Sequence, residues 1–157
     1  MPVPKKISNF LDKTKIKYEL IEHRTVFTAY DKAKTLRVPD KIVGKTLVLK
    51  IDRDLAIVLI PANRNLDKNK FRKITKTRKA DFVSEKLIKN KLKGVKVGAI
   101  PPFGILWKFK TFMDRPFLKQ PKVILNAGDY NWSIKISPAY LKKIIPDLTI
   151  GAFSQKR

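Results

Sequence analysis

The chain has 157 residues, 43% of them hydrophobic, so it is large enough for one core, and we expect a single domain over residues 1–157. It has no cysteine and one histidine, which excludes disulfide bonds, thiolate metal sites and a cysteine nucleophile, and we expect no metal and no cofactor. Lys and Arg number 36 against 13 Asp and Glu, a formal net charge of +23, which favours a polyanionic partner such as nucleic acid.

A membrane surface is the competing polyanion. The basic residues are not confined to one amphipathic helix, and no hydrophobic run reaches the roughly 18 to 20 residues of a membrane span. The N-terminus, from Met1 and Pro2 onward, lacks the apolar core of a signal peptide. These features favour RNA or DNA over lipid, and we expect a cytoplasmic protein with no membrane partner.

The first half of the chain predicts a helix, a strand, a second helix and a strong hairpin. Hydrophobic residues recur at helical spacing over the first dozen residues, and residues 18–22 predict a strand. Thr28 can cap a short helix that ends before Pro39. Residues 45–51 and 55–60 predict two antiparallel strands joined by a short polar turn. The second strand is nearly all hydrophobic, so we expect it to be central and covered on both faces.

The second half predicts two more helices, several short strands and a final helix and strand. Asp67 and Ser84 can cap helices, the second of which stops at Gly94. The later elements are strands at 109–113, 122–126 and 132–137, a helix starting at Ser137-Pro138 and a strand at 148–153. Three or four helices among about seven short strands predict an α+β fold with a mixed sheet, and not a doubly wound parallel fold.

Residues 98–104, Gly-Ala-Ile-Pro-Pro-Phe-Gly, are the most informative loop. Proline fixes φ, while glycine permits turns closed to other residues and lets a ligand approach the backbone. The loop is therefore built to hold one shape. It is either a rigid connection between strands or a wall against which a ligand lies.

Conventional catalytic groups are few. His23 is the only imidazole, and a lone histidine at a strand end is more often structural than catalytic; neither a GxSxG nor a phosphate-loop sequence is present. Lys45 is either a solvated strand start or a charge in a site. Residues 126–129 form either a simple turn or room for a ligand. Asp114 is interpreted as a turn former or a surface ion pair.

The stretch from Lys68 to Lys96 contains twelve basic and two acidic residues, a local net charge of +10. One interpretation is a pair of solvated helix faces. The other is a surface for nucleic-acid phosphates, because this charge exceeds what solubility requires.

The motifs follow a recognisable order along nearly the whole chain. They are Glu22-His23 with Thr28, Lys45-Thr46-Leu47-Val48, Leu66-Asp67 before Lys70, the loop 98–104, Asp114, Ala127-Gly128, and Ser137-Pro138 before Leu141. In this order they resemble the YbaK/ProX family of free-standing aminoacyl-tRNA deacylases, which is related to the editing domain inserted in bacterial prolyl-tRNA synthetases. The resemblance implies a curved, mixed, mostly antiparallel sheet of about seven strands surrounded by helices. It also implies hydrolysis of the ester bond of a mischarged tRNA that carries a small non-cognate amino acid.

The same resemblance implies a set of site residues. Lys45 corresponds to the functional lysine that contacts the terminal nucleotide, and Gly98 opens the GxxxP loop whose backbone holds the aminoacyl group. The other implied substrate contacts are Thr28, Tyr30, Thr46, Ala99, Ile100, Pro101, Pro102, Gly104, Asn126, Gly128 and Ser133. The implied tRNA contacts are Lys70, Arg72, Lys73, Lys76, Arg78 and Lys79. The implied partner is mischarged tRNA, with an aminoacyl-tRNA synthetase as a second candidate.

This sequence departs from the branch of the family that acts on Cys-tRNA, which carries Ser at the Asn126 position and Asp at the Ser133 position. The resemblance therefore does not imply specificity for cysteine.

An aminoacyl ester is already activated, and one oriented oxyanion donor is worth roughly 3 to 4 kcal/mol, so backbone amides would suffice to catalyse its hydrolysis. The ribose 2′-hydroxyl or the substrate amine could activate water, and a pocket shaped by Ile100, Pro101 and Tyr30 would admit only small side chains. The alternative is a non-catalytic RNA-binding module of the same fold, and a fold with neither function comes third.

Overall fold

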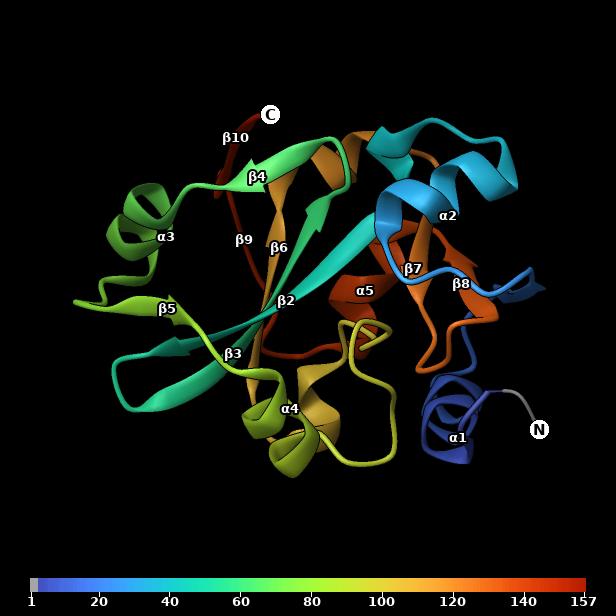
Figure 1. The fold of residues 1–157 in the computed structure, drawn as a ribbon, viewed down its shortest axis with the longest axis horizontal. Coiled ribbons are helices and arrows are strands. Elements are labelled where there is room, and N and C mark those ends of the chain that lie inside the picture. The colour runs from blue at the N-terminus through green and yellow to red at the C-terminus, as the bar shows by residue number, and fades with distance from the viewer. Residues whose placement is uncertain (1–2) are drawn as a thin grey trace.

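The computed structural model describes residues 3–157 (Figure 1), so Met1 and Pro2 of the N-terminal segment lie outside it. The helices are α1 (Lys5–Thr14), α2 (Ala29–Leu36), α3 (Lys68–Thr75), α4 (Glu85–Lys91) and α5 (Pro138–Ile144), with short 3-10 helices η1 (Asp40–Ile42), η2 (Gly104–Trp107) and η3 (Arg115–Lys119). The strands are β1 (Tyr18–Glu22), β2 (Gly44–Ile51), β3 (Asp54–Pro61), β4 (Arg64–Leu66), β5 (Ala80–Phe82), β6 (Lys110–Asp114), β7 (Val123–Asn126), β8 (Trp132–Ile136), β9 (Thr149–Gly151) and β10 (Ser154–Lys156).

Within residues 3–157 the strands form three sheets. The largest is mixed, in the order β5-β2-β3-β6-β9, and the others are the antiparallel β1-β8-β7 and the pair β10-β4. A parallel bridge between Val43 and Ile124 joins the first two sheets beside the start of β2. The α+β class and the mostly antiparallel pairing are confirmed, while the strands are divided among three sheets where one was expected.

The predicted hairpin is confirmed, with β2 and β3 paired antiparallel from Gly44↔Pro61 to Ile51↔Asp54. β3 lies between β2 and β6, and its residues 56–61 are buried because both neighbours and both faces are covered. The hairpin turn is held by Asp52, whose carboxylate accepts the backbone N–H groups of Arg78 and Lys79 at 3.0 Å each. The start of β2 is thereby presented at the opposite end of the hairpin, next to α2 (Figure 1).

The predicted last strand over 148–153 is wrong as a single element. β9 pairs in parallel with β6, and the chain then leaves that sheet so that β10 can pair with β4. The break occurs because Phe153 buries its ring against Phe71 and Phe112, with centroid distances of 5.2 and 5.9 Å. The predicted stop of the fourth helix at Gly94 also differs, since α4 ends at Lys91 and Leu92 turns into the core.

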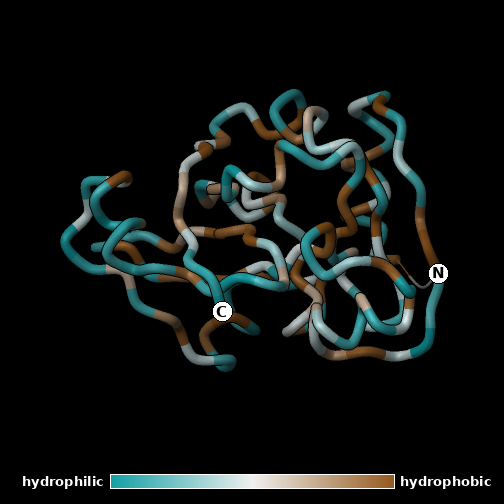
Figure 2. The backbone as a smooth tube through the Cα atoms, turned by 90° about the horizontal axis from the view of Figure 1, so that it is seen from above, coloured by the Kyte–Doolittle hydropathy of each residue, from teal (hydrophilic) through white to brown (hydrophobic). Residues whose placement is uncertain are grey.

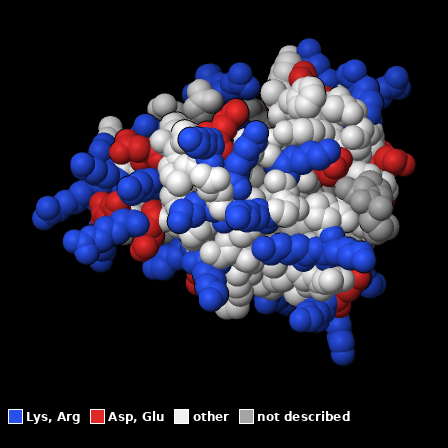
Figure 3. All heavy atoms as spheres, turned by 60° about the horizontal axis from the view of Figure 1, so that its bottom comes forward, with Lys and Arg blue, Asp and Glu red and all other residues white. Residues whose placement is uncertain are grey.

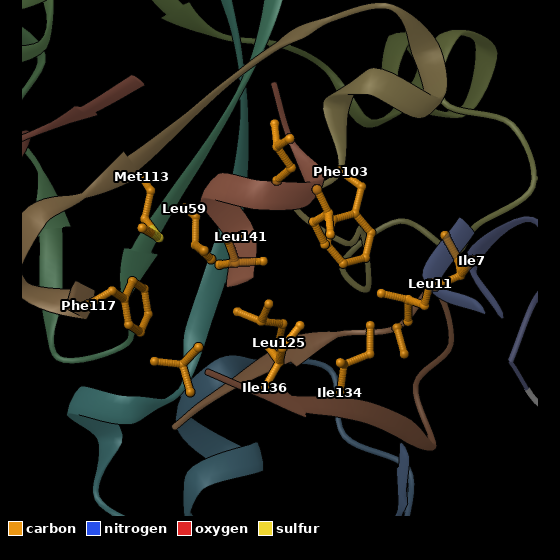
Figure 4. Packing of buried hydrophobic residues seen from close by; sticks show 14 of the residues in the cluster. Ile7, Leu11, Leu59, Phe103, Met113, Phe117, Leu125, Ile134, Ile136 and Leu141 are labelled. Carbon is orange, nitrogen blue, oxygen red and sulfur yellow. The ribbon is translucent and has the colours of Figure 1, made fainter. Parts of the chain in front are cut away.

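The main hydrophobic core lies between α1, α5 and the sheet β1-β8-β7. Figure 4 shows the side chains of Ile7, Leu11, Phe103, Leu125 and Leu141 converging, and all of them belong to one buried cluster. In Figure 2 the hydrophobic segments run through the middle of the molecule, whereas the loops at the left end are mostly hydrophilic. Among residues 3–157, no helix is long and hydrophobic enough to span a membrane.

Candidate functional site

Lys45, the second residue of β2, lines an open cavity of about 490 Å³ where the strand begins beside α2. The other lining residues are Thr28, Ala29, Tyr30, Asp31, Ala62, Asn65 and Arg157. Partial burial lowers the pKa of Lys45, and the positive charge of Arg157 lowers it further. The cavity therefore faces two cations, which suits a phosphate group.

Local sequence explains how α2 is aimed at this cavity. Thr28 is the N-cap, and its hydroxyl accepts the backbone N–H of Asp31 at 3.1 Å. The cap fixes the first turn, which carries Tyr30 at the cavity. Arg157 arrives from the other terminus, because β10 pairs with β4 and the Arg157 guanidinium donates to the Ala62 carbonyl at 3.4 Å.

The loop that begins at Gly98 is clamped by hydrogen bonds to the turn after β7. Ala99 donates its N–H to the Lys96 carbonyl at 3.0 Å and accepts the N–H of Gly128 at 2.8 Å. Lys96 in turn donates to the Gly128 carbonyl at 3.0 Å. Gly98 has a φ of +89°, and its own N–H donates no hydrogen bond within residues 3–157. The Gly98 amide is therefore a free donor on a fixed backbone.

Gly128 is required by the same clamp. Its φ is +90°, and a Cβ there would lie 3.0 Å from the Pro4 side chain and 3.1 Å from Val95. A larger residue would be strained and would push the turn away from Ala99.

A much smaller cavity of about 10 Å³ lies at this clamp. It is lined by Val26, Phe27, Thr28, Lys32, Gly98, Ala99, Asn126, Asp129 and Tyr130. Thr28 lines both cavities, so the cation-lined cavity and the Gly98 loop adjoin at this residue. The small cavity has room for about one water-sized group.

Lys32 and Asn126 form a buried polar pair beside the loop. The Lys32 ammonium donates to Asn126 Oδ1 at 2.7 Å, and the Asn126 amide donates through Nδ2 to the Ile100 carbonyl at 3.2 Å. Lys32 is only 5% exposed, and its burial lowers its pKa to about 8.

His23 lies at the end of β1 with both ring nitrogens hydrogen-bonded. Nδ1 is 2.8 Å from the Arg24 carbonyl, which can only accept, so Nδ1 carries the proton. Nε2 then accepts from the Ser133 hydroxyl at 2.8 Å. Burial lowers the pKa of His23, consistent with this neutral form. The Nε2 lone pair thus faces the buried Ser133 hydroxyl, and His23 lines neither cavity.

The structure brings only part of the expected site together. Thr28, Tyr30 and Lys45 line the larger cavity, and Thr28, Gly98, Ala99 and Asn126 line the smaller one. Gly128 holds the loop by a hydrogen bond, while Ser133 is fully buried behind His23.

Other expected residues lie outside both cavities. Ile100 packs its side chain into the core with Val48, Ile57 and Leu92, and the expected Pro101 and Pro102 are buried. Gly104 opens η2 and donates to Thr111 Oγ1 at 3.0 Å; a Cβ there would lie 2.4 Å from the Phe109 carbonyl oxygen. Thr46 points its hydroxyl into a buried position where it has no partner among residues 3–157.

Sequence reasoning missed Lys32, Asn65 and Arg157. Lys32 stands three residues after Ala29 and four before Leu36, which places it on the buried face of α2, and this spacing is the signal that could have found it. Asn65 and Arg157 carry no such local signal, because only the pairing of β4 with β10 brings them to the cavity.

The interpretation of Asp114 as a turn former or surface ion pair is wrong. The side chain is fully buried at the end of β6, and Oδ1 accepts the Phe153 N–H at 2.9 Å. The sequence could not show this, because the partners lie some forty positions away. Among residues 3–157, no three His, Asp or Glu side chains gather as a metal site.

The expected tRNA contacts lie on α3 and the loop that follows it. Arg72, Lys73 and Arg78 surround an open polar hollow of about 410 Å³ with Asn69 and Thr77. Lys70 is instead tied to the Ser154 carbonyl at 3.3 Å. In Figure 1 α3 lies at the left end and α2 in the right half, so this basic group is separate from the Lys45 cavity. Figure 3 shows basic side chains over the whole face turned forward, with fewer acidic ones among them.

The fold is of the α+β class, and its candidate site is a cation-lined cavity beside a clamped glycine-proline loop. Residues 23–144 match the aminoacyl-tRNA editing domain, and the chain belongs to this family. A search among curated proteins found no relative.

Solved structures share the fold at low sequence identity. The hypothetical protein APE2540 is 19% identical with a TM-score of 0.86, and the alignment covers 96% of this chain and 100% of that one. A "putative trans-editing enzyme for prolyl tRNA synthetase" is 15% identical with a TM-score of 0.83, covering 96% of each chain. A "putative signal transduction protein" from Marinobacter aquaeolei VT8 is 14% identical with a TM-score of 0.73, covering 97% of this chain and 31% of that one.

Proposed function

We propose that the protein is an aminoacyl-tRNA deacylase that hydrolyses the ester bond of mischarged tRNA carrying a small non-cognate amino acid. Membership of the editing-domain family supports this proposal. The observation that carries it is the meeting at Thr28 of the cavity that faces Lys45 and Arg157 with the small cavity under Gly98. On this proposal the whole chain, residues 1–157, acts as one editing domain.

The larger cavity takes the terminal nucleotide. Its volume of about 490 Å³ lies in the range of small-ligand sites. Lys45 and Arg157 neutralise the phosphate, and the side chain of Tyr30 borders the sugar or base. Because phosphate contacts carry little sequence information, this part of the site binds the common 3′ end of tRNA.

The Gly98 loop takes the aminoacyl ester. Water attacks the ester carbonyl carbon, and the free N–H of Gly98 donates to the oxygen on which negative charge develops. The bond between the carbonyl carbon and the ribose oxygen then breaks, and that oxygen leaves with a proton. The amino acid and the tRNA are the products.

The proton of the attacking water goes to the substrate. His23 lines neither cavity, so a ribose hydroxyl or the amine of the amino acid is the acceptor. The small cavity of about 10 Å³ leaves little room beside Gly98, which favours small amino-acid side chains. The basic residues around α3 bind tRNA phosphates that lie at a distance from the reacting ester. Synthetase-related proteins are candidate partners.

The test is a panel of mischarged tRNAs that includes Ala-, Ser- and Cys-charged tRNAs for proline and other acceptors. We expect hydrolysis of at least one member above the buffer rate. Salt-dependent binding that is indifferent to charging, with no turnover of any member, would contradict the proposal and favour a non-catalytic RNA-binding module.

A further inference from the structure

Lys32 is the buried cation that the proposed reaction does not use. It is on α2, only 5% exposed, and in the described part of the chain it forms no ion pair. Its one hydrogen-bond partner is the neutral Asn126 side chain, at 2.7 Å. A buried ammonium without a carboxylate costs folding free energy, so packing alone does not explain a lysine at this position.

The contact with Lys32 decides how the Asn126 amide is oriented. An ammonium can only donate, so the oxygen of Asn126 must face Lys32. The amide nitrogen then faces the Ile100 carbonyl, to which it donates at 3.2 Å. If the amide flipped, its N–H₂ group would point at the ammonium and its oxygen at a carbonyl, and both contacts would be repulsive.

Asn126 provides one of the two hydrogen bonds that tie residues 99 and 100 of the loop to β7 and the turn after it. The other is the hydrogen bond from the Gly128 N–H to the Ala99 carbonyl, at 2.8 Å. Both partners lie directly after Gly98, whose free N–H is the proposed donor to the substrate. A shift of the Ile100 carbonyl would therefore move the Gly98 amide as well.

We propose that Lys32 is a positioning residue of the editing site, which fixes the Asn126 amide and through it the loop that carries the Gly98 donor. This inference rests on the proposed function only for its kinetic consequences. The chain of contacts from Lys32 to the loop can be tested without any substrate.

The charges around Lys32 define the pH range in which it acts. Asp129 and Asn126 line the same small cavity, and His23 and Lys32 lie close enough for the lysine charge to lower the pKa of His23. On the far side of Asp129, Lys96 pairs with that carboxylate at 2.9 Å. Since burial lowers the pKa of Lys32 to about 8, the hydrogen bond to Asn126 weakens as pH rises through that value.

The kinetic test compares Lys32→Met with Lys41→Met, an exposed lysine of η1. For a hydrolysed tRNA we expect Lys32→Met to lower kcat about 10- to 100-fold with KM little changed, because a misplaced donor affects chemistry and not tRNA binding. Lys41→Met should match the wild type. An unchanged kcat in folded Lys32→Met, or a rise in KM alone, would overturn the inference.

A second variant separates positioning from folding. In Asn126→Asp the carboxylate can pair with Lys32 but cannot donate to the Ile100 carbonyl, so the fold is kept while the loop contact is lost. We expect a loss in kcat similar to that of Lys32→Met, since both variants remove the loop contact through one chain of contacts. A kcat equal to that of the wild type in folded Asn126→Asp would overturn the inference.

An NMR measurement distinguishes failure of this inference from failure of the proposed function. We expect Lys32→Met to move the side-chain amide resonances of Asn126 and to increase hydrogen exchange at Ala99 and Gly128, whose N–H groups donate within the clamp, whether or not any tRNA is hydrolysed. If those signals stay unchanged, Lys32 has no positioning role, even in an active enzyme.

Discussion

The hydroxyl of Ser154 donates to the buried carboxylate of Asp114, and this bond ties the C-terminal strand to the end of β6. The other carboxylate oxygen accepts the Phe153 N–H at 2.9 Å, and Arg64 donates to the Ser154 hydroxyl at 2.5 Å. Through this network the last strand lies beside β4 and delivers Arg157 to the Lys45 cavity. Asp114, a buried structural carboxylate that does not line the cavity, thus helps to place Arg157, one of the two cations of the cavity.

Replacing that carboxylate should destabilise the fold. Asp114→Ala leaves a buried N–H and a buried hydroxyl without their acceptor, and we expect a loss of roughly 3 kcal/mol in the free energy of unfolding. Urea denaturation measures it, with the exposed Asp54→Ala as the control. A loss no larger than that of the control would show that the network contributes nothing.

Gly98→Ala should separate backbone strain from site geometry. The added Cβ would meet only ordinary contacts, 3.6 Å from Tyr130 and 3.7 Å from the Phe27 carbonyl, so the cost is that of a positive φ, about 1 to 2 kcal/mol. Gly94→Ala is a matched control, because Gly94 also has a positive φ, its added Cβ would meet only Lys6 at an ordinary 3.7 Å, and it lies outside both cavities.

We expect the two alanine variants to lose similar stability in thermal denaturation. Only Gly98→Ala should lose deacylation, because its donor N–H moves. Equal activity of the two variants would argue that the Gly98 amide does not contact the substrate.

The burial of Lys32 predicts a pH-dependent difference in stability. Its pKa falls from 10.5 in the unfolded chain to about 8 in the folded protein, so the unfolded state binds the extra proton between these values. The penalty is fully present below pH 8 and is relieved as pH rises toward 10.5. It amounts to about 3 kcal/mol.

Lys32→Met should remove this penalty. We expect the variant to be more stable than the wild type at pH 7, with the difference shrinking as pH rises above 8. Denaturation of both proteins across this range measures the difference. A constant difference from pH 6 to 10.5 would contradict a lowered pKa for Lys32.

The basic residues around α3 predict salt-dependent tRNA binding. Each phosphate contact adds about 0.7 to 0.9 to the slope of log Kd against log salt concentration, so Lys73→Ala should reduce that slope by about 1. Lys142→Ala, an exposed lysine on α5, is the control. Identical slopes for both variants and the wild type would place the tRNA on another face.

The local parts of this structure were predictable from sequence, because their causes are local. Thr28, Asp67 and Ser84 cap their helices as expected, since a cap needs only the amides two or three residues ahead. The break at Phe153 was not predictable, because it depends on aromatic partners in α3 and β6. The burial of Lys32 could be inferred from its spacing on α2, but its role could not, since that depends on Asn126, ninety-four positions later.

The candidate site likewise combines features that are visible in the sequence with features that only the fold reveals. The glycine-proline loop stands out in sequence because its residue types are unusual, and the structure adds what clamps it, namely Gly128 and Asn126. Pro101, Pro102 and Gly104 of the loop are buried in the fold, whereas Gly98 and Ala99 line the small cavity. A motif that is continuous in sequence is therefore divided in space between cavity and core.

The most direct test of the account is single-turnover deacylation of one mischarged tRNA by wild type, Lys45→Ala and Lys50→Ala. Lys50 is an exposed lysine near the far end of the same strand, so it controls for the loss of one positive charge. We expect Lys45→Ala to lose at least about 100-fold in rate with the fold intact, and Lys50→Ala to match the wild type. Equal rates for Lys45→Ala and wild type would contradict the assignment of this cavity as the site of hydrolysis.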